Sequence, residues 1–191
     1  RNSDKEMKGA LESLLSQQMS GLILDLRDNP GGLLNSAVNI LDFFTEKGEL
    51  LVWTEGKTQK LNRKYTSKTD PIVPKEINII VLVNQGSASA SEIISGALQD
   101  LDRGIVIGRQ TFGKGLVQTV FNIDRERSLK ITTAKYYIPS GRLIQKSGYL
   151  PEDIMADTSS QDTIFYTKGG RLVSGSGGIT PDYQVELDEI E

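Results

Sequence analysis

Apolar side chains recur along the chain with the spacing of one helical face in three places. The pattern i, i+3, i+4 predicts helices over 4–19, 34–44 and 90–101. Ser3 or Asp4 stands where the first of these helices needs a capping side chain. The three segments are separated by apolar runs and by clusters of Gly, Pro, Asn and Ser, so we expect helices that alternate with strands.

Continuous apolar runs predict the strands of a central sheet. Residues 21–27 predict a buried strand, and 77–83 predict a strand buried on both faces, as in parallel sheets. A short strand follows over 104–107. The order strand, loop, helix at 21–45 and again at 77–101 predicts an α/β core with parallel strands and right-handed crossovers.

Alternation of β-branched and aromatic residues predicts two hairpins. Residues 51–54 and 58–65 flank a turn at Glu55-Gly56, and 116–123 and 129–138 flank a charged turn at 124–127. Residues 109–115 form a Gly-bearing loop. After residue 155 the chain is polar and Gly-rich, so we expect mobile loops there and a frayed tail over 186–191.

Composition and charge are ordinary for a globular protein, and they exclude some partners and some kinds of chemistry. The 191 residues fit one domain, or one domain with an appendage, and 22 basic against 25 acidic residues give a net charge of −3. This charge gives no reason to expect nucleic acid as a partner, and no apolar run approaches the roughly 20 residues of a membrane span. The chain begins Arg-Asn-Ser-Asp, which we interpret as the start of a mature or trimmed product.

Histidine and cysteine are both absent from the sequence. Their absence excludes a thiol nucleophile, a disulfide framework, a zinc ribbon, a His-containing triad and a His-ligated metal. Acid–base chemistry must then use Asp, Glu, Lys or Tyr. We expect neither a metal nor a cofactor.

Ser89 ends a strand-to-helix loop and supports two interpretations. Ser89-Ala90-Ser91-Glu92 has the form of a capping box, in which Ser89 and Glu92 satisfy helix amides. The same position places a hydroxyl at a helix N-terminus, where the dipole and the amide of Ala90 stabilise an oxyanion. Both interpretations stay open at this point.

Lys114 lies between two glycines and also supports alternatives. It is an ordinary exposed loop lysine, or it is the general base for a serine hydroxyl in a chain that lacks histidine. A lysine acts as a base only when its amine is neutral, and burial among apolar groups favours the neutral form. Residues 108–114 also fit G-x-x-x-x-G-K, the pattern of a phosphate-binding P-loop, but Gly115 and the β-pattern after it do not suit that motif.

The segment 28–32, Asp-Asn-Pro-Gly-Gly, follows the first predicted parallel strand. Ligands of α/β sheets bind at the carboxyl ends of the strands, so Gly31 and Gly32 are placed to offer amides to a substrate carbonyl. A plain Pro-Gly turn explains the same residues.

Several of these segments together resemble the C-terminal processing peptidases, also called tail-specific proteases. The resemblance runs from about residue 4 to 145, in the order and spacing of the family. The segments that carry it are Gly21–Gly32, Asn84–Ile93, Gly96–Asp100, Thr111–Gly115 with Gln118, and Tyr137–Arg142.

The resemblance implies a serine endopeptidase with a ClpP/crotonase-like α/β core, parallel strands, crossover helices and an added β-hairpin region. By the same resemblance Ser89 is the nucleophile, Lys114 the general base and Gln118 the residue that orients the lysine amine. Asp100 corresponds to a supporting acidic residue. Ala90 with Gly31 or Gly32 would supply the oxyanion hole.

The resemblance also predicts partners, location and domain boundaries. We expect a polypeptide substrate, a catalytic core over 1–155, and a Gly-rich insertion with the C-terminal segment over 156–191 that packs on or extends the core. Family members carry a PDZ domain, which this chain lacks, and work in the bacterial cell envelope, periplasmic or secreted, or in the plastid lumen. The oligomeric state is left open. The alternative functions are a catalytically incomplete peptide-binding module and a P-loop NTPase.

Overall fold

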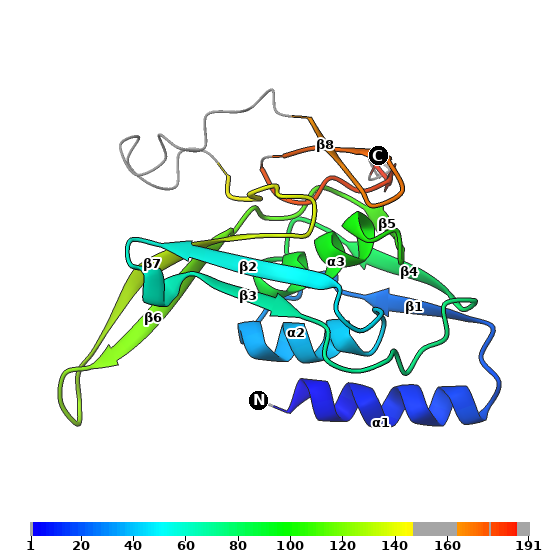
Figure 1. Cartoon of the computed structure of the whole chain (residues 1–191), viewed down its shortest axis with the longest axis horizontal. Helices are drawn as coiled ribbons and strands as arrows, with labels where there is room; N and C mark the ends of the chain where they lie inside the picture. Colours follow the sequence, from blue (N-terminus) through cyan, green and yellow to red (C-terminus); the bar gives the residue numbers. More distant parts are fainter. Residues whose placement is uncertain (1, 147–163, 176, 187–191) are drawn as a thin grey trace, which may run out of the picture.

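Two four-stranded sheets with helices between them form the chain (Figure 1). The computed structural model describes residues 2–146, 164–175 and 177–186. The first sheet has the order β1-β4-β5-β10 and is parallel throughout. Its strands are β1 (Gly21–Asp25), β4 (Asn78–Val83), β5 (Ile105–Gly108) and β10 (Tyr183–Gln184).

The second sheet is antiparallel and has the order β3-β2-β7-β6. Its strands are β2 (Leu50–Gly56), β3 (Arg63–Thr66), β6 (Leu116–Asn122) and β7 (Ser128–Tyr137). A small antiparallel pair, β8 (Phe165–Tyr166) and β9 (Leu172–Val173), lies near the C-terminal end. The predicted α/β core, its parallel strands and the 116–138 hairpin are confirmed.

All three predicted helices are present, as α1 (Ser3–Ser16), α2 (Leu34–Asp42) and α3 (Ala90–Asp100). The expected cap of the first helix is wrong, because Asn2 holds the capping position and no side-chain bond caps this end. Asp4 instead accepts a hydrogen bond from Asn39 Nδ2 at 2.8 Å, which joins α1 to α2.

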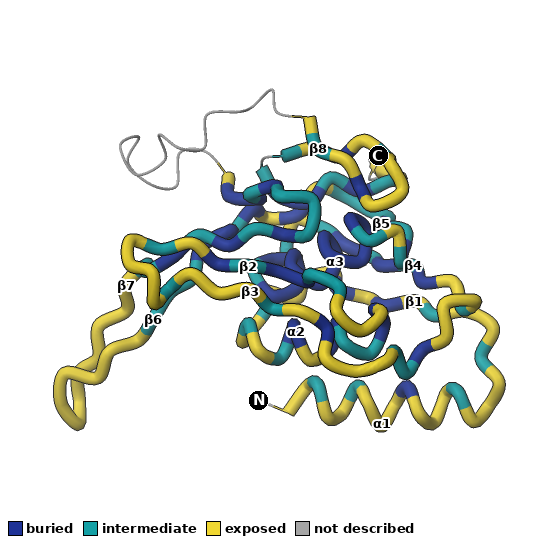
Figure 2. Tube along the Cα trace, viewed as in Figure 1, coloured by how far each residue is buried: buried dark blue, intermediate teal, exposed yellow. Residues whose placement is uncertain are grey.

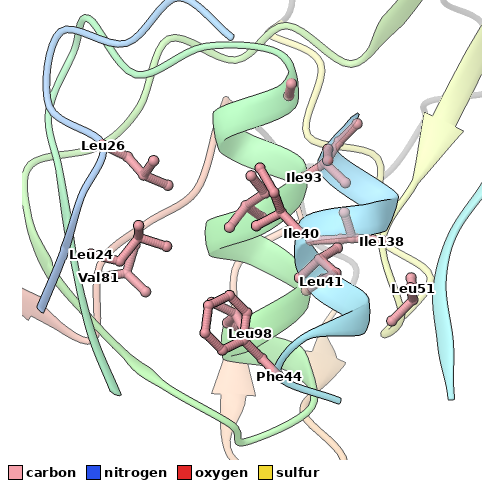
Figure 3. Close-up of a cluster of buried hydrophobic side chains, with 14 of the residues drawn as sticks. Leu24, Leu26, Ile40, Leu41, Phe44, Leu51, Val81, Ile93, Leu98 and Ile138 are labelled. Carbon is pink, nitrogen blue, oxygen red and sulfur yellow. The ribbon is translucent and has the colours of Figure 1, made fainter. Parts of the chain in front are cut away.

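The hydrophobic core extends from one sheet to the other through α2 and α3 (Figure 3). Leu24 and Val81 of the parallel sheet lie on one side of the helices, and Leu51 of β2 lies on the other. Every residue of α3 is buried, including its polar residues. A helix enclosed in this way has a fixed axis, and so it fixes the residue at its N-terminus, Ser89.

Strand β4 is buried on one face, which contradicts the expectation that both faces are covered. Ile79, Val81 and Val83 are buried beneath the helices, whereas Ile80 and Leu82 on the opposite face are half-buried. The continuous apolar run therefore did not distinguish the two faces.

The predicted turn at Glu55-Gly56 is also wrong. Both residues continue β2, where they pair with Lys135 and Ala134 of β7. The connection to β3 runs over 57–62 and contains the short 3₁₀ helix η1 (Gln59–Leu61). Nothing in the local sequence indicated that β7 pairs with β2 and extends it through these two residues.

The β6–β7 hairpin projects from the body of the molecule, and its tip is exposed (Figure 2). The amide of Ile123 donates to the Arg127 carbonyl at 2.9 Å, so the charged turn at 124–127 is confirmed.

The C-terminal region contacts the core through ion pairs and a strand. Arg171 binds Asp102 at 2.7 Å and Asp182 at 2.5 Å, and β10 extends the parallel sheet beside β5. Gly169-Gly170 lies in the turn between β8 and β9. The expectations for 155–163, Ser176 and the end of the tail, 187–191, lie outside the described residues. Within the described ranges, no helix is both long and apolar enough to span a membrane.

Candidate active site

Ser89 holds a backbone conformation that side chains rarely adopt. Its φ of 55° and ψ of −115° lie in the left-handed half of the map, immediately before α3. Such a conformation costs of the order of 1–3 kcal/mol and persists only where the surroundings enforce it. A sharp strand-to-helix turn of this kind is how α/β hydrolases present a serine hydroxyl.

The loop after β1 packs directly against this turn. Gly31 has φ 87°, and a Cβ added there would lie 2.6 Å from the Ala90 amide nitrogen and 3.0 Å from the Ser89 Cβ. Only glycine fits at this position. The Gly31 amide donates to Asn29 Oδ1 at 3.0 Å, so a side chain of the same loop already uses it.

Asn84 ties the loop after β1 to the loop after β4. Its Oδ1 accepts the amides of Asp28 and Gly86, each at 2.9 Å, and its Nδ2 donates to Asp28 Oδ1 at 3.0 Å. The Ser87 hydroxyl adds a bond of 2.7 Å to the Leu26 carbonyl. These bonds fix the two loops to each other at residues that immediately precede Ser89 in the chain.

Glu92 is the most constrained polar group beside Ser89. Its side chain is fully buried, and its Oε2 accepts the amides of Ser89 at 2.8 Å and Lys114 at 2.9 Å. Its Oε1 accepts the Thr111 hydroxyl at 2.6 Å and the Gly113 amide at 2.7 Å. Burial raises the pKa of Glu92 above its ordinary value, and the four hydrogen bonds oppose that shift.

Tyr136 contacts the same two residues through their carbonyl groups. Its hydroxyl donates to the Lys114 carbonyl and lies 3.3 Å from the Ser89 carbonyl oxygen. Burial, and next to it the charge of Glu92, raises the pKa of Tyr136 well above its ordinary value. The hydroxyl therefore stays protonated and available as a donor at any working pH.

Ser89, Lys114 and Gln118 line one cavity of about 220 Å³ between α3 and β6. The three side chains are half-buried, so the structure brings together the residues that the sequence proposed for the catalytic centre. The other residues that line this cavity are Gly32, Leu33, Leu34, Ala90, Ile93, Leu116, Val117, Lys130 and Tyr136.

Asp100 lies at the far end of α3 from Ser89. The two are eleven steps apart along the helix, which at 1.5 Å per residue is about 16 Å. Asp100 binds Arg142 at 2.7 Å and accepts the Ser140 amide at 2.9 Å, and both charged side chains are fully buried. Burial raises the pKa of Asp100 and lowers that of Arg142. The geometry thus fits an effect of Asp100 on the packing of α3 and not on the reacting atoms.

The P-loop hypothesis is wrong. The segment after Lys114 forms strand β6 where a P-loop would begin a helix. The Glu92 carboxylate already accepts the Gly113 and Lys114 amides that would bind a phosphate. A buried carboxylate in that position repels an anion.

Two residues of this centre were not identified as functional from the sequence. Glu92 was visible only as part of a capping box, and Tyr136 had no local signal, because its partners are distant in the chain. Within the part of the chain that the structure describes, no group of three or more acidic side chains is arranged to hold a metal ion.

The fold, with a strained serine at a helix N-terminus that shares a cavity with a lysine in a chain without histidine, has the features of α/β serine hydrolases. Residues 1–155 match Peptidase family S41, and the chain belongs to this family.

Related proteins agree with this assignment. The chain is 43% identical over 154 residues to a carboxy-terminal-processing protease of Bartonella bacilliformis, which covers 78% of this chain and 35% of the relative. It is 39% identical over 185 residues to a carboxyl-terminal-processing protease of Synechocystis sp., which covers 93% and 42%. A solved photosystem II D1 C-terminal processing protease aligns with a TM-score of 0.70 at 30% identity, over 97% of this chain and 39% of that chain. The chain therefore spans about two fifths or less of the length of these relatives.

Proposed function

We propose that this chain is the proteolytic domain of a carboxyl-terminal-processing serine endopeptidase that uses Ser89 and Lys114. The observation that carries the proposal is the single cavity lined by a strained Ser89, by Lys114 and by Gln118. Glu92 supports it, because one buried carboxylate binds the backbone of both residues. We assign the proteolytic core to residues 1–155 and regard 156–191 as a segment that packs on or extends it.

The reaction is acyl transfer in two halves. Lys114 in its neutral form accepts the proton of Ser89 Oγ while the oxygen attacks the peptide carbonyl, and the resulting ammonium returns the proton to the leaving amine. A water molecule then attacks the acyl-enzyme, again with Lys114 as base, and releases Ser89. Gln118 lies on the wall of the same cavity and orients the lysine amine.

The oxyanion hole consists of the amides of Ala90 and Gly32. Ala90 is the first residue of α3, where the amides and the helix dipole favour negative charge. Of the two glycines, Gly32 is preferred, because it lines the cavity whereas the Gly31 amide binds Asn29. Gly31 serves to let the two loops approach each other.

Substrate, partners and location are proposed from the relatives. The names of these carboxyl-terminal-processing proteases indicate a polypeptide cut near its C-terminus, and a PDZ domain elsewhere in the parent protein would capture that end. Relatives include bacterial and chloroplastic proteins. The bacterial envelope or an equivalent compartment is proposed as the site of action from the family resemblance.

Labelling by a fluorophosphonate probe tests the nucleophile directly. The parent chain should be labelled at Ser89, and Ser89→Ala should not be. Lys114→Arg keeps the charge but does not deprotonate at working pH, so it should neither label nor cleave unfolded casein. Lys146→Arg, an exposed lysine on the neighbouring segment, is the matched control and should behave as the parent.

Two outcomes would contradict the proposal. Equal cleavage by Lys114→Arg and parent would remove Lys114 from the role of base. Peptide binding without labelling of Ser89 would instead favour the binding-module hypothesis, in which the catalytic site is incomplete.

A further inference from the structure

Strand β6 forms an unprotected edge beside the candidate active site. It lies at one end of the order β3-β2-β7-β6, and no described strand pairs with its outer side. Its seven residues, Leu116–Asn122, contain no charge and no proline. Proteins normally protect exposed edges with charges, prolines or short strands, because such edges pair with other chains.

The opposite edge of the same sheet is protected in this way. Strand β3 has four residues, Arg63–Thr66, and two of them, Arg63 and Lys64, are basic. The contrast within one sheet indicates that the open edge at β6 is retained for use. Val120 and Phe121 on this strand are 56% and 48% exposed.

The hydrogen-bonding groups that β6 offers can be assigned from its turn. The Ile123 amide donates to Arg127, which places it on the β7 side of the strand. Successive amides of a strand point to opposite sides, and the bulge in this pair lies between Val117 and Gln118. The amides and carbonyls of Gln118, Val120 and Asn122 therefore point away from β7.

This edge leads directly into the cavity that contains Ser89 and Lys114. Leu116, Val117 and Gln118 of β6 line that cavity. From Gln118 to Asn122 the edge extends about 13 Å, enough to pair with four or five residues of an extended chain. The bulge in this pair has its extra residue, Thr133, on β7, and it lies beside the point where β6 enters the cavity, as bulges near active sites often do.

We propose that an extended segment of the polypeptide substrate binds as an added strand along the outer edge of β6, paired with the backbone of Gln118, Val120 and Asn122. The inference rests on the proposed function and deepens it by naming the surface that holds the substrate. Recognition through the backbone accepts many sequences, and the exposed Val120 and Phe121 favour apolar side chains.

A set of peptides with single N-methyl groups tests the proposal. Ser89→Ala is used to measure the affinity of a ten-residue apolar peptide and of each singly N-methylated form, so the result does not depend on catalysis. Amides that pair with β6 should lose about two- to tenfold in affinity on methylation, and the losses should alternate along the peptide. The proposal would be overturned if methylation lowered the affinity equally at adjacent positions, or if it lowered the affinity at none.

A variant of the strand gives a second test. Val120→Pro removes an outward donor, and proline is accepted on edge strands where its nitrogen faces solvent. Its kcat/KM for the ten-residue peptide should fall about two- to tenfold, with fluorophosphonate labelling of Ser89 unchanged. Arg125→Pro puts the same ring in the turn 124–127, outside both strands, and should cleave as the parent.

The outcomes are distinguishable from failure of the proposed function. If Ser89 is not labelled in the parent but binding still alternates, the edge proposal stands and the catalytic one fails. Should Val120→Pro unfold, the methylation series decides alone. A dimer that Val120→Pro dissociates without any change in peptide binding would overturn the proposal and make a second copy the occupant of this edge.

Discussion

Ser89 and Lys114 are 25 residues apart in the chain, yet two side chains bind both of them. Glu92 accepts their amides, at 2.8 and 2.9 Å. The Tyr136 hydroxyl contacts their carbonyls. The backbone of each residue is thus held at both its amide and its carbonyl, which positions the two side chains without requiring a bond between them.

Glu92→Gln should weaken both the fold and the activity. The NH₂ group of the new glutamine is a donor, and all four partners of Glu92 are donors too. At least one buried N–H or hydroxyl therefore loses its acceptor. Each such loss costs about 1–3 kcal/mol of unfolding free energy. We expect kcat/KM at least tenfold lower at a temperature where the variant is folded. Urea denaturation and peptide cleavage measure the two effects, with exposed Glu126→Gln as control.

The pH dependence of stability should carry the signature of Glu92. Burial raises its pKa, so the folded state favours the protonated form. The stabilisation from this shift is complete below about 4.5, the ordinary value, and is lost as the pH rises through the raised value. The stability of the parent relative to Glu92→Gln should therefore fall with rising pH above 4.5. A slope of opposite sign would show that the four hydrogen bonds outweigh desolvation.

Tyr136→Phe should reduce activity by roughly fivefold to thirtyfold while the protein stays folded. The change removes a hydroxyl that bonds the Lys114 carbonyl and costs about 1–2 kcal/mol. Tyr65→Phe, a half-buried tyrosine of β3, is the comparison. Equal kcat/KM for Tyr136→Phe and parent would show that Glu92 alone positions the two residues.

Gly31→Ala and Gly32→Ala should differ sharply although they are adjacent. A Cβ at Gly31 would lie 2.6 Å from the Ala90 nitrogen, and its φ of 87° disfavours alanine. A Cβ at Gly32 meets nothing within 4 Å, and alanine keeps the amide that we propose for the oxyanion. The added Cβ of Gly31→Ala should displace the Ala90 amide, so we expect activity to fall about a hundredfold or more, as when an oxyanion donor is lost. Gly32→Ala should lose less than a few-fold. Circular dichroism and peptide cleavage follow both.

Asp100→Asn should destabilise the fold more than it slows the reaction. It leaves the Arg142 guanidinium buried without its counter-charge, at a cost of about 3–5 kcal/mol. The double variant Asp100→Asn, Arg142→Gln should be less destabilised than the sum of the single changes. A large fall in kcat with unchanged unfolding free energy would instead give Asp100 a role nearer the chemistry.

The sequence predicted the helices and the parallel strands, because these depend on short-range periodicity. The motifs around Ser89 and Lys114 left their roles open, and the family resemblance was needed to assign them, with Gln118, to one catalytic site. The turn at Glu55-Gly56 was misplaced because β7, 80 residues further along, extends β2 through pairing.

Glu92 shows the limit of local interpretation. Its capping-box pattern was visible, but three of its four partners come from Thr111–Lys114, about 20 residues away. A pattern that explained the residue locally gave no reason to look further. Tyr136 and the Asp100–Arg142 pair had the same disadvantage, since their partners meet only after the two sheets have packed.

The order in which the chain is synthesised adds a consequence. Thr111, whose hydroxyl binds Glu92, also accepts the Ile179 amide at 2.7 Å and donates its own amide to the Ile179 carbonyl at 3.1 Å. Contacts between residues so far apart carry a cost in chain entropy that local contacts do not. The loop that carries Lys114 therefore gains this support only after residue 179 has left the ribosome.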